Sequence, residues 1–335
     1  RDIWFSTANG FTPSHGPTDS HVSDGDLLSA EGRVVRRNQE LTARLGIMAI
    51  VPDLGLDAMD VLPGGEIVFS LEQDVWSETL GQLQQGDLLS ERGYVVRTIQ
   101  QLLAAFGPMP SISDVGLDTV HFLNQSNSIG VGDEIFFSIE TNIFSEKLGV
   151  MLRRGDLLSS AGYIVQRNEE LLARFHPVSP EPALARDYGL DALYIWPGGG
   201  EIWFSVEEGF EDAQLGRVLP GDLLSDRGTV IAGNRELLAA FSPLEDLADF
   251  GLDALFIVEA ASLSAAVPSL HIGLSAPSGR LVLQWSGLGR VFQLEKATNV
   301  TGPYVPVGPP SPDGRFEEGV DSGGASWAFY RVRQW

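Results

Sequence analysis

The sequence has no cysteine among its 335 residues, which excludes disulfide bonds, thiolate metal ligands and cysteine nucleophiles. Lysine is also scarce, because Lys147 and Lys296 are the two that the chain has. In total 22 basic residues face 45 acidic ones, for a net charge of −23. We expect no nucleic-acid partner, because phosphate binding needs clustered lysine and arginine. The excess of carboxylates favours a cation, and a divalent metal ion first.

Long hydrophobic runs are missing as well. No stretch approaches the roughly eighteen apolar residues of a membrane span, so we expect no membrane insertion. The chain starts at Arg1 without an initiator Met or a signal peptide, which we interpret as a processed product or a fragment.

Catalytic motifs are absent too: there is no nucleophile elbow, zinc-protease helix, phosphate-binding loop or dinucleotide fingerprint. The five histidines fall at non-equivalent places and suggest no metal triad. A glycosidase pair of carboxylates stays open because acidic residues are abundant. We nevertheless expect no enzyme, because the acidic residues recur with the repeats described next, whereas an active site is usually asymmetric.

The sequence consists largely of one block of motifs that occurs four times. The motif Gly-Asp-Leu-Leu-Ser recurs at spacings of 61, 69 and 66 residues, beginning at Gly25, Gly86, Gly155 and Gly221. A second motif, Gly-Leu-Asp followed by Ala or Thr, begins at Gly55, Gly116, Gly189 and Gly251. This period predicts four tandem repeats of about 65 residues, in which each copy forms one structural unit.

Each copy predicts a small sheet and a short helix. The opening strand alternates apolar and polar residues, as in Ile202–Glu207. Its equivalents are Ile3–Thr7, Ile67–Glu72 and Ile135–Glu140. Leu-Leu-Ser predicts a second strand, and segments such as Tyr163–Val165 a third. The predicted helix N-caps are Asn38, Asn168 and Asn234. The second copy has Ile99 instead, so we expect a weaker helix start there.

The Gly-Leu-Asp-Ala segment predicts a fourth strand. In the third copy, Gly189–Ile195 is apolar on both faces and must be covered on both sides. The turn Trp196–Gly200 then predicts a hairpin with the next opening strand. Four strands and a helix per copy, each sheet covered by its neighbours, predict an all-β chain with short helices folded as a four-bladed β-propeller.

The ends of the repeat array predict how the ring closes. The first copy has no inner strand before it, and a spare one, Gly251–Val258, follows the fourth helix. Pairing with Asp2–Ser6 would complete the first blade of the same chain. Pairing with another molecule would instead propagate head to tail as a fibre. The short connection from the fourth helix favours closure within the chain.

This order of an Asp-Ala inner strand, a hairpin, two outer strands and a helix resembles the hemopexin family over residues 1–258. The resemblance implies a four-bladed propeller whose Asp-Ala strands line an ion-holding channel. Hemopexin blades are shorter, and their disulfide between the first and last blades is impossible here. The repeat motifs are also similar to those of large secreted proteins of planctomycete-type and verrucomicrobial bacteria.

The candidate metal site consists of the aspartates of the inner strands, Asp57, Asp118, Asp191 and Asp253. In a propeller these strands surround the axis, and oxygen ligands at that density suit Ca²⁺. The alternative is that each aspartate caps a turn or pairs with an arginine. The Gly-Asp-Leu-Leu-Ser aspartates partly match a dockerin calcium loop, but a turn that enters a strand explains them better. The aspartates before Gly-Leu favour a turn as well, and a divalent ion at these repeated turns stays open.

After Val258 the composition changes. Residues 259–269 are rich in Ala and Ser and predict a linker. Residues 270–335 predict a small β-sandwich with strands at Arg280–Ser286, Val291–Lys296, Tyr304–Val307 and Trp327–Arg333. This part resembles the fibronectin type III-like modules of secreted bacterial proteins, which space or attach other domains.

Together these patterns predict a non-catalytic bacterial protein, secreted to the cell surface or outside the cell, with a structural or adhesive role. Its partners would be further copies in a fibre or an extracellular glycan. A carbohydrate-binding propeller is the alternative, using the equivalent positions Trp4, Val68, Phe136 and Trp203, and a glycoside hydrolase comes third. Asn124 and Asn299 are glycosylation acceptors if the source glycosylates.

Overall fold

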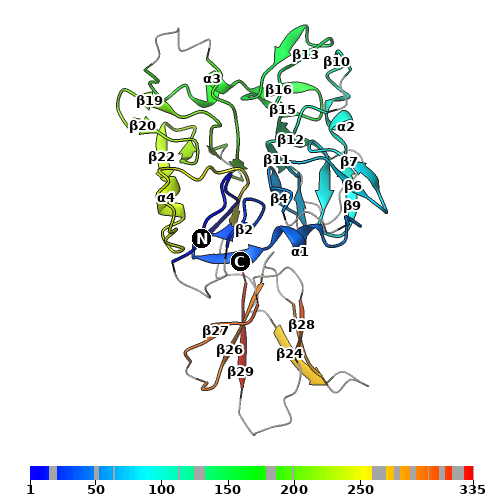
Figure 1. Cartoon of the computed structure of the whole chain (residues 1–335), viewed down its shortest axis with the longest axis vertical. Coiled ribbons are helices and arrows are strands. Elements are labelled where there is room, and N and C mark those ends of the chain that lie inside the picture. The colour runs from blue at the N-terminus through cyan, green and yellow to red at the C-terminus, as the bar shows by residue number, and fades with distance from the viewer. Residues whose placement is uncertain are drawn as a thin grey trace. The chain divides into compact units, whose positions relative to one another are not determined.

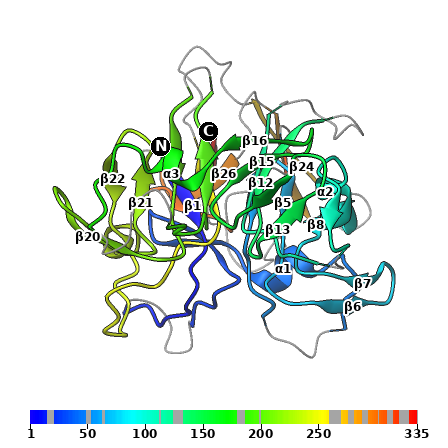
Figure 2. The same cartoon turned by 90° about the horizontal axis from the view of Figure 1, so that it is seen from above.

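The computed structural model (Figures 1 and 2) forms two compact units. The larger contains Asp2–Leu62 and Glu66–Ile257, and the smaller contains Val258–Trp335 with Arg1 and Pro63–Gly65. The residues that the structure describes are 1–14, 21–48, 53–62, 65–111, 114–123, 133–178, 186–197, 200–258, 269–274, 280–286, 292–300, 302–308, 314–318 and 328–334.

The larger unit contains four antiparallel sheets of four strands, which confirms the all-β prediction. Sheet A has the order β23 (Leu255–Val258), β1 (Asp2–Phe5), β2 (Leu27–Ser29) and β3 (Arg33–Arg36). Sheet B has the order β4 (Met59–Val61), β5 (Ile67–Phe69), β8 (Leu88–Ser90) and β9 (Tyr94–Arg97). Sheet C has the order β11 (Thr119–Phe122), β12 (Ile135–Ser138), β15 (Leu157–Ser159) and β16 (Tyr163–Gln166). Sheet D has the order β17 (Leu193–Ile195), β18 (Ile202–Phe204), β21 (Leu223–Ser225) and β22 (Thr229–Ala232).

One short helix follows the last strand of each sheet: α1 (Asn38–Thr42), α2 (Ile99–Leu103), α3 (Asn168–Leu171) and α4 (Asn234–Leu237). Within the larger unit the four helices succeed one another around a common centre, from blue through cyan and green to yellow (Figure 1).

The spare inner strand pairs within its own chain. β23 is the neighbour of β1 in sheet A. The Ser6 amide donates to the Ala254 carbonyl oxygen at 3.3 Å, and the Ala254 amide donates to Ser6 Oγ at 2.9 Å. The predicted pairing of Gly251–Val258 with Asp2–Ser6 is thus confirmed, and β23 is not left free for another molecule.

Hydrogen bonds between sheets form a closed cycle. In each sheet the serine that ends the opening-strand motif donates its hydroxyl to a leucine carbonyl oxygen of the next sheet. The pairs are Ser6 to Leu56, Ser70 to Leu117, Ser138 to Leu190 and Ser205 to Leu252, at 2.9, 2.9, 3.1 and 2.7 Å. The cycle therefore runs from A through B, C and D back to A.

Close contacts at the glycine turns join neighbouring sheets in the same cyclic order. The turn between the third and fourth strands of each sheet contains a glycine that lies against the end of the preceding sheet's helix. A Cβ atom at Gly162 would lie 2.7 Å from the Ala105 Cβ, and one at Gly32 would lie 2.8 Å from the Ala240 Cβ. Larger side chains at these turns would separate neighbouring sheets.

Additional strand pairs, which the sequence patterns did not predict, lie outside sheets B, C and D. They are β6 (Val75–Ser77) with β7 (Gly81–Leu83), β13 (Ile143–Ser145) with β14 (Val150–Leu152) and β10 (Pro108–Met109), and β19 (Phe210–Asp212) with β20 (Gly216–Val218). Alternation over three residues is too short a signal to identify a strand.

The predicted helix starts are wrong by one residue. Asn38 is the first helical residue, and Arg37 precedes it as the N-cap. The Asn38 side chain instead joins the helix to the inner-strand segment, donating to the Gly55 carbonyl oxygen at 2.9 Å and accepting from the Leu54 amide at 3.1 Å. The weaker helix predicted in the second copy is also wrong, because the Thr98 hydroxyl caps α2 by accepting from the Gln101 amide.

The smaller unit contains two three-stranded antiparallel sheets. One has the order β24 (Ser269–Leu274), β25 (Leu281–Ser286) and β28 (Arg315–Glu318), and the other β27 (Val305–Pro306), β26 (Phe292–Ala297) and β29 (Phe329–Gln334). Side chains of both sheets form one apolar core around Trp285, Phe292 and Leu294. Most of the predicted linker and the acceptor Asn124 lie outside the described residues, and Asn299 is exposed.

Among the described residues, no helix is long and apolar enough to cross a membrane.

Candidate metal centre

In each copy an aspartate forms a turn just before the inner strand. In the second sheet the Asp53 carboxylate accepts a hydrogen bond from the Gly55 amide at 2.9 Å. Gly55 has a φ of 74°, a left-handed conformation that favours glycine. A Cβ atom there would lie 2.4 Å from Cδ of Glu72. The same turn recurs in all four copies, so Asp53, Asp114, Asp187 and Asp249 are the turn formers that the sequence predicts.

Two of the four predicted aspartates, Asp57 and Asp118, lie in one close group with Glu140, and Asp253 is near enough to Asp191 and Asp57 to be repelled by both. Asp57, Asp118 and Asp253 are buried, with 7, 3 and 5 % of their surface exposed, and Asp191 is partly buried. Loss of hydration raises the pKa of all four carboxyls well above the usual range. Mutual repulsion adds to this effect, as between Asp57 and Asp118. The four side chains thus form one electrostatically coupled cluster.

Three glutamates, which the sequence reasoning missed, extend the cluster. Glu72, Glu140 and Glu207 each stand two residues after the serine of the inter-sheet cycle. Burial is the main cause that raises the pKa of Glu72 and of Glu207 to about 7, and it also raises the pKa of Glu140. The spacing Ser-x-Glu in three of four copies was the available signal, and the first copy has Ala8 in that place.

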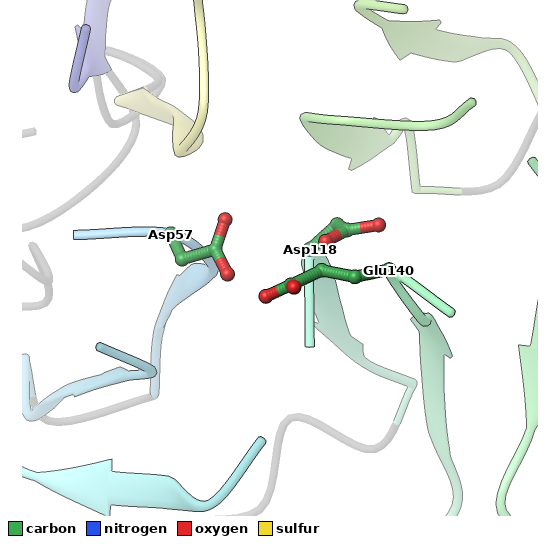
Figure 3. A group of neighbouring side chains, drawn as sticks. All are labelled: Asp57, Asp118 and Glu140. Carbon is green, nitrogen blue, oxygen red and sulfur yellow. The ribbon is translucent and has the colours of Figure 1, made fainter. Parts of the chain in front are cut away.

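The carboxyl groups approach one another most closely between sheets B and C. Asp57, Asp118 and Glu140 each offer one oxygen within 4.8 Å of the others. Figure 3 shows the Glu140 side chain extending towards Asp57, and after burial the repulsion from Glu140 is the next cause that raises the pKa of Asp57. Repulsion at this separation favours either a retained proton or a bound cation.

Several oxygens of the cluster have no hydrogen-bond donor. Within the described part of the chain, Oδ2 of Asp57, of Asp118 and of Asp253 and Oε1 of Glu207 are buried and lack a partner. A buried carboxylate oxygen without a donor is unfavourable, because the lost hydration is not replaced. A hard cation with oxygen ligands would replace it, so the residues present fit Ca²⁺ chemistry.

Positive charge reaches the cluster from one side. Among the described residues, the ion pair that involves Glu72, Glu140 or Glu207 is the one between Arg154 and Glu207, in which Nη1 lies 2.7 Å from Oε2. Arg154 Nη2 also pairs with Glu208. A proton or a cation from solution would therefore have to balance the negative charge of the remaining cluster carboxylates.

The Gly-Asp-Leu-Leu-Ser aspartates are structural. Asp222 accepts from the Asn234 amide at 3.0 Å through Oδ1 and from the Leu219 amide at 2.9 Å through Oδ2. Asp26 and Asp87 accept hydrogen bonds from the equivalent two backbone amides of their own copies. Both oxygens of these three aspartates are thus used by the backbone, which supports the turn interpretation over a calcium loop. In the third copy Asp156 Oδ2 accepts from the Arg153 amide at 2.9 Å, whereas its Oδ1 is buried without a partner among the described residues.

Further along the inner strands, three of the four equivalent positions have an aromatic residue and one has a carboxylate. Three residues after the cluster aspartates stand Asp60, His121, Tyr194 and Phe256. His121 Nδ1 lies 3.7 Å from Asp60 Oδ2, and the His121 and Tyr194 ring centroids are 6.0 Å apart. Tyr194 in turn contacts Phe256 at 5.9 Å. Asp60 is thus the one carboxylate among these four residues, and it lies beside the His121 imidazole.

Scans of this chain against protein-family models, against curated proteins and against solved structures returned no match in any of the three.

Proposed function

We propose that sheets A to D are the blades of a four-bladed β-propeller. The support is the closed cycle of serine-to-leucine hydrogen bonds, together with the pairing of β23 with β1. The inner strands β4 and β23 are buried at every residue, as a blade covered on both faces requires. A density map of the protein tests this architecture, since four-fold pseudo-symmetry is expected and an open row of sheets would overturn it.

We propose further that the central acidic cluster binds a divalent cation, Ca²⁺ by ligand chemistry. The observation that carries this proposal is the set of buried aspartate oxygens without donors in Asp57, Asp118 and Asp253. A cation there would contact residues of several sheets at once and so stabilise the ring. The role is structural and non-catalytic, in agreement with an acidic cluster that recurs with the fold.

In this proposal the protein is a secreted surface protein with a structural or adhesive role, and the smaller unit is a fibronectin type III-like module for attachment. The pairing of β23 with β1 favours a self-contained ring over a fibre built by strand donation. The carbohydrate-binding alternative has weaker support, because Trp4, Val68 and Phe136 are buried and do not offer a stacking surface.

Isothermal titration of the chelator-treated full chain with Ca²⁺ tests the cation site. We expect saturable binding that is lost when Asp57, Asp118, Asp191 and Asp253 are all changed to Asn. The matched control is Glu78→Gln, which removes an exposed carboxylate outside the cluster. Unchanged binding by the fourfold variant would show that these aspartates do not form the cation site. Folding of each variant is checked by thermal unfolding in chelator.

A further inference from the structure

The residue before each Gly-Asp turn differs among the four copies. It is Asp24 in the first, Gln85 in the second, Arg154 in the third and Pro220 in the fourth. The first three interact with the cluster glutamate of the next sheet, so each glutamate has a different neighbour. This variation breaks the equivalence of the four sides of the acidic cluster.

Two of the three interactions are direct contacts. Gln85 Nε2 donates to Glu140 Oε2 at 3.1 Å, so Glu140 has a neutral partner and keeps its charge uncompensated. Arg154 Nη1 donates to Glu207 Oε2 at 2.7 Å, and its Nη2 donates to Glu208, so one positive charge lies against Glu207 and Glu208. Glu72 instead experiences repulsion from Asp24 and Asp53.

Two further differences among the sheets indicate which carboxylates could hold the cation. Sheet A has Ala8 where the other sheets have a glutamate, so it offers no second carboxylate. Glu72 is not among the carboxylates that approach within 4.8 Å of one another, whereas Glu140 forms such a group with Asp57 and Asp118. A buried oxygen without a donor does not distinguish the sides of the cluster, because among the described residues Asp57, Asp118, Asp253 and Glu207 each have one.

We propose that the cation is held off-centre, between sheets B and C, by Asp57, Asp118 and Glu140, and that Arg154 is a built-in counter-ion that excludes a second cation from the Glu207 side. This inference rests on the proposed cation-binding function. It makes Arg154 a residue that determines how many cations the cluster takes. A guanidinium is suited to this role because it stays charged at any ordinary pH.

The test compares Glu140→Gln with Glu207→Gln in Ca²⁺ titrations of the full chain. These substitutions are matched, since each removes one charge from equivalent positions of neighbouring sheets. We expect Glu140→Gln to weaken Ca²⁺ binding about tenfold or more, and Glu207→Gln to weaken it less than about threefold. We expect Arg154→Gln to bind a second Ca²⁺, or to bind the first more tightly.

The outcomes separate this inference from the proposed function. If the wild-type chain binds no Ca²⁺, both are overturned. If the wild-type chain binds Ca²⁺ but Glu140→Gln and Glu207→Gln weaken it equally, the off-centre site is wrong while the cation-binding function stands. If Arg154→Gln changes neither affinity nor stoichiometry, the counter-ion role of Arg154 is wrong. Thermal unfolding in chelator shows that each variant is folded.

Discussion

The hydroxyl of Ser205 donates a 2.7 Å hydrogen bond to the carbonyl oxygen of Leu252, a residue of the segment that leads into β23. This contact joins sheet D to sheet A, and sheet A also contains the first strand of the chain. Ser205 therefore connects the last repeat to the first, and three equivalent serines connect the others.

Substitution of the cycle serines should destabilise the larger unit. Ser70 donates to the Leu117 carbonyl oxygen at 2.9 Å and accepts from the Ala58 amide at 2.8 Å, both in buried surroundings. Ser70→Ala leaves both groups without their partner, so we expect the free energy of unfolding to fall by about 1–3 kcal/mol. Chemical denaturation measures this loss. Exposed Ser111→Ala is the control, and an equal effect in both variants would show that the cycle does not contribute.

The acidic cluster should make the cation-free protein more stable in mild acid than at neutral pH. Burial raises the pKa of Glu72 and of Glu207 to about 7 from the model-compound value of 4.5, so the folded state retains protons that the unfolded state loses. The stability that protonation provides is fully present below pH 4.5 and is lost as the pH rises through about 7. Melting temperatures in chelator should therefore fall between about pH 5 and 8.

The fourfold Asp→Asn variant is the comparison for this pH dependence. Its amides carry no charge and bind no titrating proton, so the four carboxyls whose pKa burial raises no longer contribute to the pH dependence. We expect the variant to melt higher than the wild type at pH 8 in chelator and to show a weaker pH dependence. A wild-type melting temperature that rises with pH over this range would contradict the predicted protonation.

Addition of Ca²⁺ should reverse the destabilisation at neutral pH. A ligand that binds only the folded state at a hundred times its dissociation constant stabilises by about 2.7 kcal/mol. The rise in melting temperature should be larger at pH 8 than at pH 5.5, because protons compete for the same oxygens. Titration in two buffers of different ionisation enthalpy would detect the released protons. An equal shift at both pH values would place the bound ion on other groups.

Gly55→Ala should cost more stability than Gly81→Ala. Both glycines have positive φ, 74° and 85°, so both variants incur backbone strain of about 1 kcal/mol. A Cβ atom at Gly55 would also lie 2.6 Å from the Glu72 Cβ, whereas one at Gly81 meets nothing within 4 Å. We expect Gly55→Ala to show the larger loss in denaturant unfolding and to weaken Ca²⁺ binding as Glu72 is displaced. Equal losses would mean that Glu72 adjusts without cost.

Much of the repeat unit could be predicted because its signals are local. The apolar segment at Leu193–Ile195 and the turn after it predicted the hairpin with Ile202–Phe204, which the structure contains. The Asx turn at Asp53 follows from one side chain and an amide two residues away. The helix starts were harder to predict, because the Asn38 side chain donates to the Gly55 carbonyl oxygen, seventeen residues away, and does not cap its own helix.

The sequence by itself determined that four equivalent units exist and that an aspartate begins each inner strand, because both are written as a period in the chain. Only the tertiary structure decided which carboxylates meet. Glu140 lies close to Asp57 although 83 positions separate them, and Arg154 pairs with Glu207 across 53 positions. Such contacts depend on how neighbouring sheets pack, and the energy of a buried charge depends on what surrounds it in space, not on its neighbours along the chain.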